Sequence, residues 1–112
     1  MSEHIEQCLL IKWASLIPEL NCLFSVPNGG HRHVAVAAKL KREGVKAGVP
    51  DLMLPIARGG FNGMFIEMKA PKGRCSDVQV IWLERLSNNG YKTAVCFGFE
   101  EAKKSIIEYL NL

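Results

Sequence analysis

The spacing of apolar residues divides the chain into short helices and strands. Near the N-terminus, apolar residues three and four positions apart predict a helix over residues 3–17. They are Ile5, Cys8, Leu9, Trp13 and Leu16. Ser2 is placed to cap this helix and Pro18 to end it. Helical core spacing also makes packing the expected role of Trp13 and, in a later helix, of Trp82.

Further along, short apolar runs alternate with amphipathic segments. Strands are predicted at residues 22–26, 51–56, 64–70 and 93–97. Helices are predicted at residues 31–43, 77–89 and 99–110. Ser76 or Asp77 would cap the second of these helices, and Asn62–Gly63 is a typical hairpin turn between the second and third strands. The order α-β-α-β-β-α-β-α predicts an α/β fold with a mixed central sheet flanked by helices.

Composition narrows the class of protein. The length of 112 residues suits one domain, residues 1–112, and 48% hydrophobic residues exclude a wholly disordered chain. Four cysteines without a C-x-x-C pair indicate a reduced, intracellular and cytoplasmic protein without structural zinc. Acidic residues near the N-terminus and the lack of a long apolar run argue against secretion and against a membrane span.

Positive charge is concentrated in the middle of the chain. Between Asn28 and Arg74 there are nine basic and three acidic residues, a net charge of +6, while the rest of the chain carries −3. Either a solvated helix face or contacts with a phosphate backbone would explain this pattern. The candidates for DNA contact are Asn28, Arg32, Lys39, Lys41, Arg42, Lys46, Lys72 and Arg74. His31 and His33 are expected at the surface or at phosphate, because their spacing on a helix makes a poor metal chelate.

Two charges interrupt an otherwise apolar strand. Glu67 and Lys69 are two residues apart, so they project from the same face. Asp51 opens the preceding strand, and a hairpin would bring it close to Glu67. Two carboxylates with a lysine suit Mg²⁺ and phosphodiester hydrolysis. The alternative is a plain surface ion pair on a half-exposed strand.

An ordered set of motifs resembles a nuclease family. It comprises 27-PNGG-30 with Arg32, 43-EGVKAGVPDL-52, 67-EMKAP-71, Ser76 with Gln79, and 90-GY-91. This set is similar to the VRR-NUC domain family of the PD-(D/E)XK nuclease superfamily, and the resemblance runs nearly end to end. It implies a restriction-endonuclease-like core, which agrees with the order of elements above.

The resemblance also implies roles for individual residues. Asp51, Glu67 and the main-chain carbonyl of Met68 would bind Mg²⁺ or Mn²⁺, and Lys69 would be the catalytic lysine. A further acid from the first helix completes such sites, and Glu6 is preferred here to Glu3. Gln79 matches a glutamine beside the active site, although an exposed helix amide is the simpler explanation of that residue.

The activity implied by this resemblance is metal-dependent cleavage of DNA. Stand-alone members of the family resemble homodimers that cut branched DNA such as four-way (Holliday) junctions. The alternative from another class is a catalytically silent nucleic-acid-binding module. A second enzyme alternative is a flap, nick or restriction-type nuclease. A small stand-alone nuclease would also fit a phage or mobile element.

Overall fold

A four-stranded sheet forms the centre of the protein in this computed structural model, which describes residues 2–27 and 33–112. The strands lie in the order β1 (Phe24–Ser25), β2 (Leu52–Leu54), β3 (Met64–Lys69) and β4 (Lys92–Phe97). The first three pair antiparallel, and β3 pairs with β4 in parallel. The mixed sheet is therefore confirmed.

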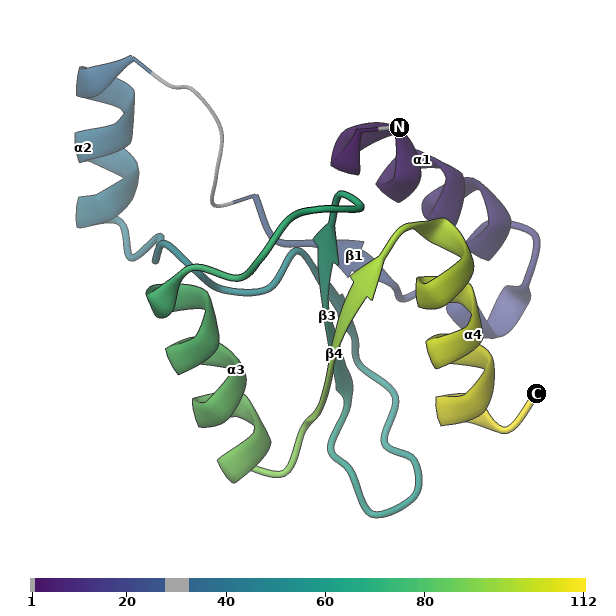
Figure 1. Ribbon diagram of the computed structural model, residues 1–112. Coiled ribbons are helices and arrows are strands. Elements are labelled where there is room, and N and C mark those ends of the chain that lie inside the picture. Colours follow the sequence, from purple (N-terminus) through teal and green to yellow (C-terminus); the bar gives the residue numbers. More distant parts are fainter. Residues whose placement is uncertain (1, 28–32) are drawn as a thin grey trace.

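Helices lie on both sides of this sheet. In Figure 1, α1 (Glu3–Ala14) and α4 (Phe99–Leu110) lie to its right, α3 (Asp77–Asn88) lies to its left, and α2 (Val34–Arg42) stands apart. The predicted order of helices and strands is confirmed, with one added 3₁₀ turn at Pro18–Leu20. No helix in the described part of the chain is long and apolar enough to cross a membrane.

The core lies where the sheet meets α1 and α4. Its fully buried apolar side chains are Leu10, Ala14, Leu20, Leu52, Leu54, Met64, Ile66, Met68, Cys96, Ala102, Ile106 and Leu110. Trp13 packs against this cluster, whereas Trp82 is half-buried with the Arg85 guanidinium 4.9 Å from its ring centroid. Five of the six β3 residues are buried, so any charge on this strand lies next to the core.

The first helix differs from its prediction in length and in the face that it buries. It ends at Ala14, because Pro18 disfavours helical geometry in the residue before it and the chain turns at residues 15–17. Leu10 and Ala14 are buried, whereas Leu9 is 38% and Leu16 78% exposed. Apolar residues occur on every side of α1, so their spacing could not select the packed face.

The hairpin between β2 and β3 is confirmed, but its turn lies elsewhere. Arg58 and Phe61 exchange main-chain hydrogen bonds around Gly59–Gly60, whose φ angles of 59° and 87° suit a type I′ turn. Asn62 is instead tied to the end of α3: its N–H donates to the Gly90 carbonyl over 2.8 Å, and its side-chain amide donates to the Asn89 carbonyl over 3.0 Å.

The first strand and the second helix are shorter than predicted, whereas α4 has its predicted bounds and β4 begins one residue earlier, at Lys92. The first strand is reduced to Phe24–Ser25, because the chain still turns at residues 21–22. The second helix begins after His33, whose Nδ1 accepts a hydrogen bond from the Ala35 N–H over 3.2 Å. This capping role accounts for a histidine at that position. Asn28, His31 and Arg32 lie outside the described residues.

Candidate active site

Asp51 is fixed by two neighbouring strands. It directly precedes β2, and its main-chain carbonyl accepts a hydrogen bond from the Val26 N–H over 2.8 Å. Its carboxylate Oδ2 accepts one from the Met68 N–H over 2.7 Å. The N–H and C=O of one strand residue point to the same side, so the Met68 carbonyl also faces Asp51.

Glu67 and Lys69 project from the same face of β3, as their spacing predicts. Glu67 is 2% and Lys69 7% exposed, so this is not a surface ion pair. The Lys69 Nζ lies 3.6 Å from the Glu67 Oε2. Burying two charges costs several kcal/mol per ion unless they are paired and hydrogen-bonded. A strand that keeps both charges at the core therefore indicates a functional constraint.

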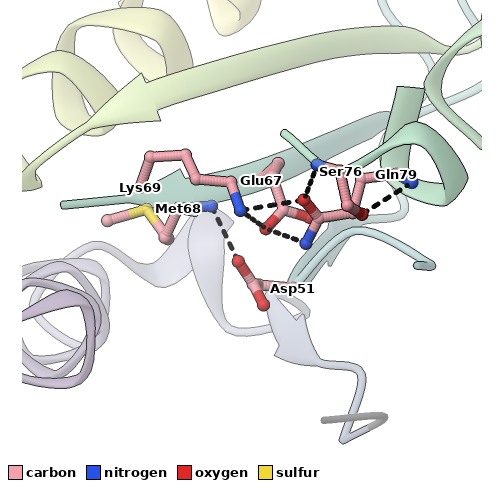
Figure 2. A network of polar contacts seen from close by, with 6 residues as sticks. All are labelled: Asp51, Glu67, Met68, Lys69, Ser76 and Gln79. Carbon is pink, nitrogen blue, oxygen red and sulfur yellow. Dashed lines mark hydrogen bonds and ion pairs between the residues drawn. The ribbon is translucent and has the colours of Figure 1, made fainter. Parts of the chain in front are cut away.

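Gln79 connects these charges to the start of α3 (Figure 2). Its Oε1 accepts hydrogen bonds from Lys69 Nζ over 2.9 Å and from the Ser76 N–H over 2.8 Å, and its Nε2 donates to Glu67 Oε2 over 3.3 Å. The Ser76 hydroxyl in turn accepts from the Gln79 N–H, which completes a capping box. Gln79 is thus a fixed partner of Glu67 and Lys69 rather than an exposed helix amide.

The environment of Glu67 disfavours its charged form. Burial, then the nearby negative charge of Asp51 and hydrogen bonding to it, raise the pKa of Glu67 from 4.5 to about 8, against the opposing effect of Lys69. Two carboxyl groups this close resist ionising together unless a cation lies between them.

We expect Glu67→Gln to stabilise the protein in a chelator at neutral pH. The folded state holds the Glu67 proton more tightly than the unfolded state does, so stability falls as pH rises from 4.5 to about 8. Glutamine removes this loss, on the order of 1 kcal/mol or more. Thermal unfolding in EDTA at several pH values checks this, and a steeper pH dependence in the variant would contradict it.

The donor set fits a divalent cation with oxygen ligands. Within the described residues, no three His, Cys, Asp or Glu side chains form a complete metal cage. Mg²⁺ does not require one, since proteins commonly hold it with one or two carboxylates plus water and substrate phosphate. Asp51 and Glu67, with the nearby Met68 carbonyl, supply such a set.

A cavity of about 1040 Å³ gives access to these carboxylates. Its lining includes Asp51, Glu67 and Gln79, together with residues 23–27 and residues of α1. The α1 residues include Glu3, Gln7 and Ile11. Gln7 and Ile11 were not predicted as site residues, although Glu3, Gln7 and Ile11 recur at intervals of four and so share one helix face.

The structure gives Glu6, the acid preferred from sequence, a different partner. Its Oε1 accepts a hydrogen bond from the Phe99 N–H over 2.8 Å, at the start of α4. The N-cap residue there is Gly98, which has no side chain to satisfy that donor, and a Cβ on it would lie 2.7 Å from Glu6 Oε1. Glu6 therefore caps α4, while Glu3 lines the cavity.

The candidate DNA-contact residues within the described chain are all exposed. They are Lys39, Lys41, Arg42, Lys46, Lys72 and Arg74. The first three lie on α2, which has no buried residue. Lys72 and Arg74 lie between Lys69 and the start of α3, close in sequence to both.

Comparison with known proteins agrees with this geometry. The model of the VRR-NUC domain family matches residues 2–100. A solved structure described as a VRR_NUC domain protein is 30% identical, with a TM-score of 0.88, and the match covers 100% of this chain and 90% of that one. No curated protein matches the chain. The chain belongs to the VRR-NUC domain family, which is of the nuclease type, so the comparison supports nuclease activity on DNA.

Proposed function

We propose that this protein is a Mg²⁺- or Mn²⁺-dependent endonuclease that hydrolyses phosphodiester bonds in DNA. The observation that supports this most directly is that two carboxylates, Asp51 and Glu67, line one open cavity, with the Lys69 Nζ 3.6 Å from Glu67 Oε2. A module that only bound DNA would gain nothing from two carboxylates facing a polyanion.

Asp51, Glu67 and the Met68 carbonyl would hold the metal ion, with Glu3 of α1, which lines the same cavity, as a further acid. Bound there, the ion would offset negative charge on the phosphate and help to ionise the attacking water. The Lys69 ammonium would hold the attacking water and stabilise the charge that develops on the phosphate oxygens. Gln79 would hold the Lys69 and Glu67 side chains in position, since its Oε1 bonds to Lys69 and its Nε2 to Glu67.

Glu3 and Glu6 provide a matched pair of variants. Glu6→Ala should lower stability by about 1 kcal/mol, because the Phe99 N–H at the start of α4 loses its acceptor. Cleavage per folded molecule should be retained in this variant. Glu3→Ala should keep the melting temperature and lower cleavage by about tenfold or more, since Glu3 lines the cavity. Thermal unfolding and cleavage rates measured side by side distinguish the two, and the reverse pattern would contradict the assignment.

Branched DNA is the substrate class that we propose, with four-way junctions as the leading example and a homodimer as the active form. The exposed basic residues on α2 and before α3 would contact phosphates, which position DNA without reading sequence. Two copies related by a two-fold axis would match the symmetry of a junction.

The proposed substrate class is tested with linear, flap and four-way-junction DNA of equal length and matched sequence, in Mg²⁺. We expect paired, symmetric cuts on the junction and at least about tenfold slower cutting of the other two. Preferential cutting of flaps or linear duplex would overturn the proposed junction preference, but the proposed nuclease activity would remain supported.

A further inference from the structure

Strand β4 forms one edge of the sheet, and its outer side is open. The Lys92 N–H donates to the Gly63 carbonyl over 2.9 Å, which fixes the register with β3. Alternate residues of a strand point their N–H and C=O groups to opposite sides. Lys92, Ala94 and Cys96 therefore bond to β3, whereas the main-chain groups of Thr93 and Val95 point away from the sheet.

Little protects this edge. Glu101 Oε1 accepts the Phe97 N–H over 3.1 Å, at the end of the strand. Within the described residues, the main-chain groups of Thr93 and Val95 have no such partner. Residues 93–96 (TAVC) contain no charge and no proline, and the one charged residue of β4 is Lys92 at its start. Natural edge strands usually carry one of these features, because a bare edge pairs with another strand.

A cavity lies beside the same stretch of β4. It has a volume of about 450 Å³, and residues 92–95 form one of its walls. Ser105, Glu108 and Tyr109 of α4 and Phe61 of the hairpin loop also line it. The space next to the edge can therefore receive side chains of an added strand.

We infer that a second copy of this chain pairs with β4, antiparallel and centred on Ala94. In this register Thr93 of each copy faces Val95 of the other, and each such pair exchanges both main-chain hydrogen bonds. The outward groups that lack partners in one chain are then satisfied. Ala94 meets its own counterpart on the two-fold axis, where a small side chain leaves room for the approach.

Charge favours a second copy over an unrelated extended peptide. Lys92 stands at one end of β4, and Glu101 lies against Phe97 at the other end. Antiparallel pairing brings the Lys92 end of each copy to the Glu101 end of its partner. Parallel pairing would instead place Lys92 beside Lys92. The charges at the two ends of β4 are thus complementary between two copies in the antiparallel orientation. An isologous interface requires such self-complementarity.

This pairing would also place two active sites on one sheet. Glu67 lies opposite Val95 on β3, next to β4. The two β3 strands would be three strand spacings apart, about 14 Å, with both sites on the same face. The two-site role rests on the proposed nuclease function, whereas the strand pairing itself does not.

The test combines molecular mass with amide hydrogen exchange on the full chain. By light scattering we expect twice the 12.4 kDa of one chain at high concentration. The Thr93 and Val95 amides should exchange about tenfold or more slowly in the dimer than in dilute monomer. A monomer at every concentration, or a dimer in which these two amides gain no protection, would overturn the inference.

Variants of Val95 test whether dimerisation can be removed without loss of DNA cleavage. Val95→Pro removes an N–H that β3 does not use and should give a monomer, whereas Val95→Ile keeps the donor and should remain dimeric. The proline variant should still make metal-dependent single cuts but lose paired cuts on a junction. A dimeric proline variant would contradict the proposed register. If the wild type dimerises through these amides but cuts no DNA, the nuclease proposal fails and the interface stands.

Discussion

Replacement of Lys69 by methionine is expected to lower the rate of DNA cleavage by about 10²–10⁴-fold while the protein stays folded. Methionine keeps most of the side-chain volume in a position that is 7% exposed, so little packing is lost. What disappears is the ammonium group, which lies 2.9 Å from Gln79 Oε1 and 3.6 Å from Glu67 Oε2. Single-turnover cleavage with enzyme in excess measures the effect.

Lys72→Met is the matched control for this substitution. It removes the same charge three residues away, from an exposed position outside the Glu67–Gln79 network. Its cleavage rate should stay within a few-fold of wild type, with slightly weaker binding at higher salt. Lys69→Met should bind DNA nearly as well as wild type in a fluorescence anisotropy titration. If Lys69→Met cleaved DNA at the wild-type rate, the proposed catalytic role of Lys69 would be wrong.

The second large effect is expected for Asp51→Asn, which should weaken metal binding and slow cleavage. An asparagine oxygen can still accept the Met68 N–H bond that Asp51 accepts over 2.7 Å, so the fold should be kept. The negative charge is gone, and with it one of the two carboxylates that suit a divalent ion. We expect Mn²⁺ affinity to fall about tenfold or more by calorimetry, and cleavage about 10²-fold or more.

Asp77→Asn is the control for that variant, because Asp77 is an exposed acid in the first turn of α3. It should bind Mn²⁺ and cut DNA as the wild type does. Unchanged Mn²⁺ binding in Asp51→Asn would show that the ion is held elsewhere, and the proposed ligand set would then be wrong.

The sequence predicts the order of elements and the mixed sheet because these depend on local periodicity and on one hairpin. The exact turn does not follow in the same way. The segment 58-RGGFNG-63 contains two turn signals, Gly59–Gly60 and Asn62–Gly63. The choice between them depends on Asn62 bonding to Asn89 and Gly90, which are distant in sequence.

The same distinction applies to the candidate site. The convergence of Asp51 with Glu67 and Lys69 could be expected, since alternation along a strand and hairpin pairing both follow simple rules. The choice between Glu3 and Glu6 could not, because the two acids lie within about one helical turn. In the structure the Phe99 N–H engages Glu6, and we therefore propose Glu3 as the further acid. The hint in the sequence is Gly98, which has no side chain to accept a hydrogen bond from the first turn of the helix that it precedes.

The most direct test of the metal-dependent nuclease is cleavage of an end-labelled four-way junction by the wild-type protein in Mg²⁺, in Mn²⁺ and in EDTA. We expect cuts in either metal, no cuts in EDTA, and cutting at least about 10²-fold slower with Asp51→Asn in either metal. DNA binding without cuts in both metals would contradict it and favour a catalytically silent binding module. Equal cutting in EDTA would contradict the metal requirement.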